Sequence, residues 1–151
     1  MGNAYLMSGL QQGPEIFKWI LDRADKSLYK TKTDAERFAF AEIFAHMADW
    51  EPISMGRMQS CVEAPGSTVQ VWDEIQRAID LKYLETDPAE QLELWTRLRA
   101  DTIQFLSENA DGNWEKSVLH PERGIVSLAD VANMEVAHDT YHIRQLLDFL
   151  A

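Results

Sequence analysis

The stretch SLADVANMEVAHDTYHIRQLLDFL, from Ser127 to Leu150, decides the fold because it specifies a long amphipathic helix. Ser127 can cap the first free amides, and Asp130 lies in the first turn, where the helix dipole favours a carboxylate. We therefore predict a helix over residues 127–150. Its apolar residues recur at helical spacing on one face: Leu128, Val131, Met134, Ile143, Leu146 and Leu150.

Three upstream segments have the same character. We predict helices over residues 14–29, 34–60 and 88–109, each with apolar residues at helical spacing. Residues typical of a helix start precede or open each segment, because they satisfy free amides or suit the first turn. In order, they are Pro14 with Glu15, Thr33 with Glu36, and Asp87 with Pro88.

The predicted fold is all-α: a four-helix bundle in a single domain of residues 1–151. The connections after the second and third helices, residues 61–87 and 110–126, are longer than is usual in bundles. The first could contain a further short helix over residues 71–84. Such connections either cover a functional site or change the topology of the bundle, and the sequence leaves both alternatives open.

Composition narrows the classes of function. The 151 residues are 46% hydrophobic and 26% charged, which is typical of a globular chain. The formal net charge of −11 disfavours nucleic acid and anionic lipid as partners. No apolar run approaches the ~20 residues of a membrane span, the N-terminal residues lack a secretory pattern, and the single cysteine suits a reducing compartment. We therefore expect a cytoplasmic protein with neither membrane nor nucleic acid as a partner.

Two histidines lie four residues apart in the last predicted helix. His138 and His142 share one helix face with Cβ atoms about 5–6 Å apart, so both rings can reach one metal ion. His46 is the first candidate for a third ligand. It lies about 20 Å along its predicted helix from the cap at Thr33, and the pair lies about 16–22 Å along the last helix from the cap at Ser127. All three are near mid-helix and share a level whichever way the helices run. His120, in the loop before the last helix, is the weaker candidate.

Each of these residues also has a simpler interpretation. An isolated histidine on an apolar face is usually a core residue that bonds a backbone carbonyl, and this alternative is strongest for His46 alone. The spacing of the pair and the shared level favour a three-histidine site for one divalent metal, with positions left open as in catalytic sites. Glu42, one turn before His46, is a candidate catalytic base, with a solvated carboxylate as the alternative. Asp139 points about 100° away from His138 and is expected to bond a neighbouring helix.

Two motifs resemble the DinB/YfiT-like superfamily of metalloenzymes. HMADWE, residues 46–51, is similar to the family's motif in its second helix, and HDTYHIRQ, residues 138–145, to the motif in its fourth. HPERGIVSLADV also resembles the family's entry into the last helix, so the resemblance covers nearly the whole chain. It implies a four-helix bundle and a divalent metal, usually zinc or nickel, held by His46, His138 and His142. Characterised members include transferases and isomerases that depend on low-molecular-weight thiols.

We therefore expect a metal-dependent enzyme, most simply a thiol-dependent S-transferase or isomerase acting on a small electrophile. A divalent ion can lower the pKa of a thiol or a water and polarise a substrate oxygen. Hydrolysis by a metal-activated water is the alternative in the same class, and a non-catalytic metal-binding or dimerisation module is the alternative outside it. We also expect a homodimer. Arg57 and Arg144 could bind an anionic substrate, or could be surface charges.

Overall fold

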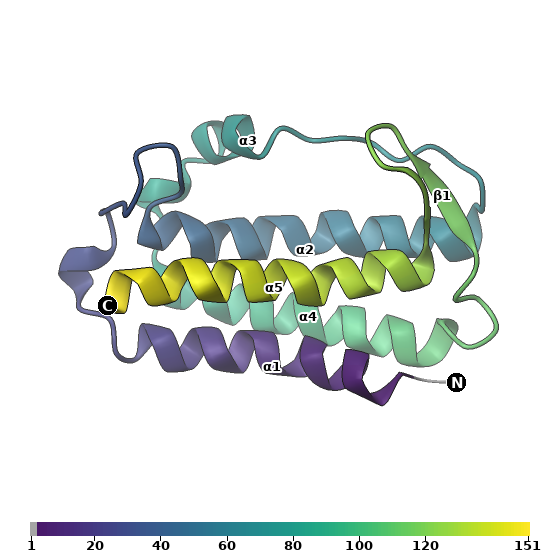
Figure 1. The fold of residues 1–151 in the computed structure, drawn as a ribbon, viewed down its shortest axis with the longest axis horizontal. Coiled ribbons are helices and arrows are strands. Elements are labelled where there is room, and N and C mark those ends of the chain that lie inside the picture. Colours follow the sequence, from purple (N-terminus) through teal and green to yellow (C-terminus); the bar gives the residue numbers. More distant parts are fainter. Residues whose placement is uncertain (1–2) are drawn as a thin grey trace.

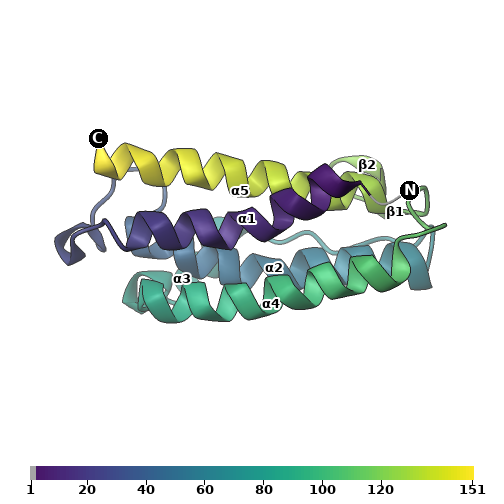
Figure 2. The same ribbon diagram turned by 90° about the horizontal axis from the view of Figure 1, so that it is seen from below.

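Four long helices lie side by side in the computed structural model, which describes residues 3–151 (Figures 1 and 2). The first and second both pack against the two that follow in the C-terminal half, so the predicted bundle is confirmed. Among the described residues no helix combines the length and the apolarity needed to cross a bilayer. The four helices are α1 (Ala4–Leu21), α2 (Phe40–Glu63), α4 (Pro88–Asn109) and α5 (Leu128–Leu150).

A two-stranded antiparallel sheet precedes α5, so the prediction of a purely α-helical chain needs correction. β1 (Ser117–His120) pairs with β2 (Gly124–Ser127), and Gly124 adopts the positive φ of +79° that the turn requires. The linker after α2 runs along β1, where the Leu119 N–H donates to the Ser67 carbonyl at 2.8 Å and the Leu119 carbonyl accepts the Val69 N–H at 3.0 Å. We did not predict this sheet from the sequence, because each of its two strands is only four residues long.

The observed helix boundaries agree best with the predicted ones where the sequence has strong capping residues. α4 begins at Pro88 after Asp87, whose Oδ1 accepts the N–H of Ala89 at 2.7 Å. α5 begins after Ser127, and Ser127 and Asp130 form a reciprocal capping box. Both helices match their predicted ranges to within one residue.

The predicted range of the first helix is wrong at both ends, because α1 begins at Ala4 and ends at Leu21. Asn3 caps it, and Pro14 lies inside the helix rather than at its start. A proline in a helix leaves the carbonyl four residues earlier without its usual donor. Here that carbonyl belongs to Leu10, and it accepts a hydrogen bond from Arg99 Nη1 of α4 at 3.0 Å instead. A tertiary contact therefore compensates for the proline.

The second helix also begins later than predicted, at Phe40 rather than residue 34. Residues 34–39 form a turn in which Asp34 Oδ1 accepts the Glu36 N–H at 2.9 Å, so Glu36 does not complete the expected capping box. Glu42 supports the true start, because its Oε2 accepts the N–H of Ala39 at 2.7 Å.

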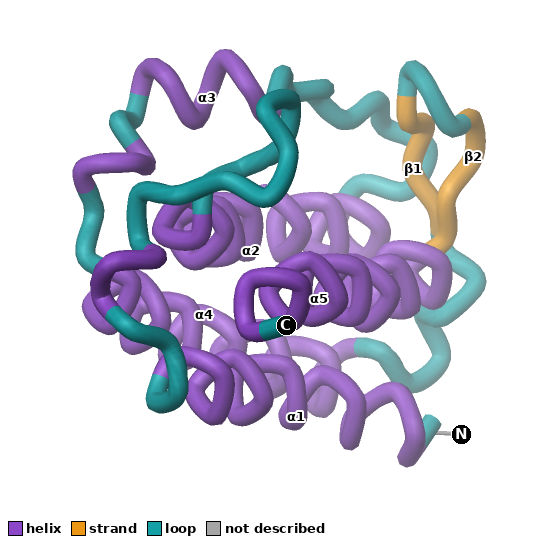
Figure 3. Tube along the Cα trace, turned by 60° about the vertical axis from the view of Figure 1, so that its left-hand side comes forward, coloured by secondary structure: helices purple, strands orange, loops and turns teal. Residues whose placement is uncertain are grey.

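The linker between α2 and α4 contains a short helix, as residues 71–84 suggested. This is α3 (Glu74–Asp80), followed by the 3-10 turn η2 (Tyr83–Glu85); a similar turn, η1 (Lys26–Leu28), follows α1. Figure 3 shows α3 lying to one side of the four long helices. Asp49 of α2 ties the linker down, because it accepts two hydrogen bonds from Arg77 at 2.7 Å and one from the Tyr83 hydroxyl.

Two apolar clusters fill the bundle, and buried polar side chains separate them along α2, α4 and α5. In α4, for example, Trp95 belongs to one cluster and Leu106 to the other, with Arg99 buried between them. In α2 the same role falls to Glu51 and Ser54. The interior of the bundle is therefore layered, with polar groups near its middle.

Candidate metal centre

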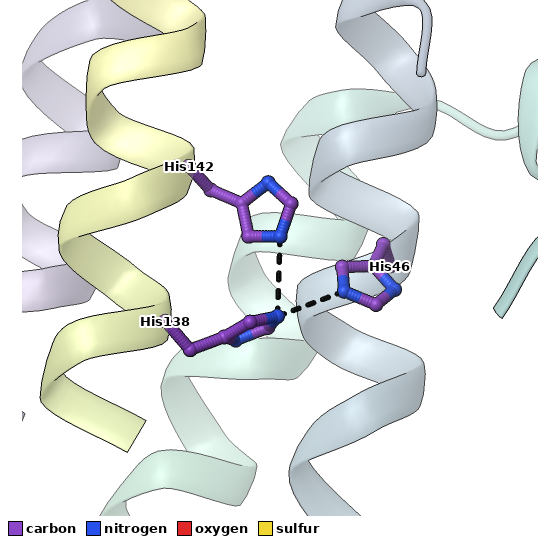
Figure 4. Close-up of side chains that lie close together, drawn as sticks. All are labelled: His46, His138 and His142. Carbon is purple, nitrogen blue, oxygen red and sulfur yellow. Dashed lines mark hydrogen bonds between the residues drawn. The ribbon is translucent and has the colours of Figure 1, made fainter. Parts of the chain in front are cut away.

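Three histidines from two helices converge beside this polar layer (Figure 4). His138 Nε2 lies 2.9 Å from His46 Nε2 and 3.1 Å from His142 Nε2. His46 comes from α2 and the other two from α5. The structure thus brings together the three residues that the sequence singled out, with one ligand atom of each within 4.8 Å of the others.

The spacing of these nitrogens fits a shared ion. Two nitrogens bound about 2.1 Å from one ion lie about 3.0 Å apart when their bonds meet at a right angle, and about 3.4 Å apart in a tetrahedron. The observed 2.9 and 3.1 Å are close to the first value. Three protein ligands leave coordination positions on the ion for water or a substrate. Within residues 3–151 no fourth histidine, cysteine or carboxylate joins the group.

The protonation of the rings also suits metal binding. Burial lowers the pKa of His138 to about 3 and that of His142 to about 4, and it lowers the pKa of His46 well below its usual value. All three rings are therefore neutral at pH 7 and can offer lone pairs. His142 Nδ1 lies 2.9 Å from Gln145 Oε1, and donation of the Nδ1 proton to that oxygen leaves Nε2 as the ligating nitrogen.

Aromatic rings fix the orientation of the histidines. The ring centroid of His46 lies 5.0 Å from that of Phe38 and 5.4 Å from that of Trp50. The ring of Tyr141 meets His142 edge-on at 5.0 Å. His46 is fully buried and His142 is 4% exposed, so access is from the side of the half-buried His138.

Two cavities open on His138, with volumes of about 330 and 280 Å³. Both are bordered by Glu74 of α3 and Tyr141 of α5, so the linker after α2 forms part of the wall. His120, the weaker sequence candidate, lies at the end of β1 and lines the larger cavity outside the three-histidine group. The long linker is thus a cover over the histidines, one of the two roles its length suggested.

A buried ion-pair network lies behind the histidines and was not predicted. Arg99 of α4 donates through Nε and Nη2 to Glu51 at 2.8 and 2.9 Å, and through Nη1 and Nη2 to Asp139 at 2.6 and 3.0 Å. Trp95 Nε1 donates to Glu51 at 2.9 Å. Asp139 therefore bonds a neighbouring helix, as expected, and it directly follows the metal-ligand candidate His138.

The network contains more negative than positive groups. Glu135 joins it, with its Oε2 3.7 Å from Arg99 Nη2 and its Oε1 accepting a short hydrogen bond from the Ser54 hydroxyl. Burial raises the pKa of Glu135 to about 8 and that of Asp139 to about 6. Three carboxyl groups thus lie around one guanidinium, and burial favours the neutral form of two of them, Glu135 and Asp139.

One feature of the sequence could have revealed this network. Arg99 lies on the buried face of α4, between Trp95 and Thr102. An arginine inside a stripe of buried residues needs carboxylate partners. Glu51 and Asp139 are the mid-helix acids of the two histidine motifs, yet their pairing depends on helix packing and not on spacing.

Two other residues that the sequence suggested as functional, Glu42 and Arg144, do not belong to the three-histidine group. The Glu42 carboxylate bonds the start of α2, and it does not line either cavity beside the histidines; a catalytic role for it stays a prediction. Arg144 is exposed and pairs with Asp148 at 3.3 Å on the same helix. Cys61, expected in a loop, lies in α2 and is buried in an apolar cluster.

Comparison with known proteins places this geometry in a family. A family model described as the DinB superfamily matches residues 10–146, whereas no curated protein sequence matches significantly. YfiT from Bacillus subtilis, described as a probable metal-dependent hydrolase with an unusual four-helix bundle topology, aligns with a TM-score of 0.91 at 18% identity over 99% of this chain and 87% of YfiT. The mycothiol-dependent maleylpyruvate isomerase aligns with a TM-score of 0.77 at 14% identity over 97% of this chain and 61% of the isomerase. These structures share the fold, and the match over most of its length shows that the chain belongs to the DinB superfamily.

Proposed function

We propose that this protein is a divalent-metal-dependent enzyme whose ion is held by His46, His138 and His142. The observation that carries the proposal is the convergence of three neutral imidazoles beside an open cavity. A structural site would surround the ion with protein ligands, whereas three ligands and a cavity leave room for a substrate. Zinc and nickel are the candidate ions, because imidazole ligands suit both.

The reaction we favour is thiol-dependent transfer to a small electrophile, or isomerisation of one. A bound divalent ion would supply Lewis acidity, which lowers the pKa of a thiol and stabilises negative charge on a substrate oxygen. The protein's own residues would hold the ligands in place: Gln145 orients His142, and Trp50 packs on His46. The fold shared with a mycothiol-dependent isomerase supports the thiol, and the fold shared with YfiT supports hydrolysis as the second candidate.

The proposed reaction also needs a base that accepts the proton of the nucleophile. Glu42 is our candidate from the sequence, and it would have to leave its hydrogen bond to the Ala39 N–H to act. Glu42→Gln tests this role, because glutamine can still accept that backbone hydrogen bond but is a far weaker base. A loss of turnover with unchanged stability would support the role, and unchanged turnover would remove it.

The experiment compares two reactions in protein loaded with Zn²⁺ or Ni²⁺. One assay follows the conjugation of 1-chloro-2,4-dinitrobenzene with glutathione, cysteine and 2-mercaptoethanol, and the other follows the hydrolysis of p-nitrophenyl acetate. Thiol-dependent turnover that disappears in His46→Ala supports the transferase, whereas hydrolysis alone supports the second candidate. A thermal melt with a chelator is the control, because loss of cooperative folding would indicate a structural metal.

A further inference from the structure

A guanidinium with unused donors lies in the larger cavity beside the histidines. Arg57 of α2 donates one hydrogen bond, from Nη2 to the Gln70 carbonyl at 3.3 Å. Its Nε is buried without a hydrogen-bond partner. Among the described residues Arg57 has no ion pair, whereas Arg77 and Arg99 each bond a carboxylate at 2.8 Å or less. The guanidinium therefore keeps unused donors that can serve an anion in the cavity.

A second unpaired arginine faces the same cavity. Arg123, in the turn between β1 and β2, also lacks an ion pair within residues 3–151 and lines the cavity with Arg57. Three glutamates border the same cavity, Glu74, Glu122 and Glu135, and none of them reaches ion-pair distance of either guanidinium. In a chain with a net charge of −11, two guanidinium groups that border one cavity and form no ion pair among the described residues indicate a site for an external anion.

We propose that Arg57, with Arg123 beside it, binds a carboxylate at the far end of an elongated substrate whose reactive group lies at the histidines. This proposal rests on the proposed function, because it assigns the substrate class of that same site. Arg57 is a specificity-determining residue in this account. Arginine suits the role because its planar fork matches a carboxylate with two hydrogen bonds.

The positions of Arg57 and His46 set the length of the ligand. Arg57 lies three turns after His46, which is about 16 Å along α2 at 1.5 Å per residue. Its guanidinium leans back over Trp50, 5.7 Å from the ring centroid, as helical side chains do. The remaining distance from the histidines is about 10 Å, and a cavity of about 330 Å³ can hold a chain of that length.

Matched six-carbon probes test the proposal. Hexanoate and 1-hexanol are titrated into metal-free protein, with the fluorescence of Trp50 and Trp72 in the cavity wall as the readout. 6-Mercaptohexanoate and 6-mercaptohexan-1-ol are titrated into Zn²⁺-loaded protein by calorimetry. We expect each acid to bind about tenfold or more tightly than its alcohol, and Arg57→Gln to abolish that preference. Arg57→Lys, which keeps the charge and loses the fork, should retain part of it.

Arg144→Gln is the control, because it removes the same charge from an arginine that pairs with Asp148 outside both cavities. Equal binding of acid and alcohol by the wild-type protein overturns the proposal. So does a preference that survives Arg57→Gln, or an absence of detectable binding by any probe. If Zn²⁺ does not bind, the proposed function fails, while the metal-free titration still tests Arg57.

Discussion

Replacement of Arg99 by methionine should destabilise the protein severely. The guanidinium is 1% exposed and donates two hydrogen bonds to Glu51, two to Asp139 and one to the Leu10 carbonyl. Methionine fills similar space but leaves buried carboxylates without their cation. Removal of one partner of a buried ion pair typically costs about 3–5 kcal/mol. Because Arg99 serves two carboxylates directly, we expect the upper part of that range.

Urea unfolding at pH 7.5 measures this cost, with Arg97→Met as the control. Arg97 lies on the exposed side of the same helix and pairs with Glu93 at 3.5 Å, so its loss should cost less than about 1 kcal/mol. For a chain of this length, 3–5 kcal/mol corresponds to a decrease of about 6–20 °C in the melting temperature. The slope m should stay constant if both variants remain two-state.

The pH dependence of Arg99→Met provides a second check. Burial already raises the pKa of Asp139, and without the guanidinium that pKa lies still further above its value in the unfolded chain. The folded variant then binds more protons than the unfolded chain, and its stability should recover as the pH falls from 8 to 6. A loss of less than about 1 kcal/mol, or a loss independent of pH, would refute the charge argument.

Three further predictions concern other parts of the bundle. Gly13→Ala should lower the free energy of unfolding in urea by about 1–3 kcal/mol, because a Cβ at Gly13 would overlap the Asp139 carboxylate. Gly56→Ala is the control: its Cβ would meet no atom, so it should stabilise α2 by ~0.5–1 kcal/mol, and equal effects of the two substitutions would contradict this prediction. Asp49→Asn removes the charge that Arg77 binds, so proteolysis of the linker over residues 66–87 should accelerate, and an unchanged rate would count against its role as a tether. In the metal-free protein the rings of His138 and His142 should stay neutral as the pH falls from 6.5 to 5, because burial lowers their pKa to about 3 and about 4; an NMR titration of the imidazole protons checks this, and a pKa near 6.5 for either ring would contradict it.

The parts of the fold that local chemistry determines were predictable from the sequence. Asp87 and Ser127 cap their helices through side-chain contacts within three residues, and those two boundaries are correct. Pro14 misled the prediction, because the hydrogen bond that compensates for it joins Leu10 to Arg99, which lies 89 residues further along the chain. Local sequence does not contain that contact.

The same distinction applies to the candidate site. Two histidines one helical turn apart and a third at the same depth could be placed together from helix geometry alone. The Arg99 network could not, because its members come from three helices and their pairing depends on how those helices rotate about their axes. The free fork of Arg57 was equally hidden, since a surface arginine and an unpaired arginine in a cavity look identical in sequence.

Metal analysis of the untagged protein tests the central claim most directly. Protein purified without chelator, then dialysed, should contain about one divalent ion per chain by mass spectrometry, because three neutral imidazoles converge on one point. His138→Ala removes the ring whose Nε2 lies between the other two, and it should leave the metal content near that of the buffer while the bundle remains folded. A wild-type protein without metal after incubation with Zn²⁺ or Ni²⁺, or a His138→Ala variant that binds as much as the wild type, would contradict the account.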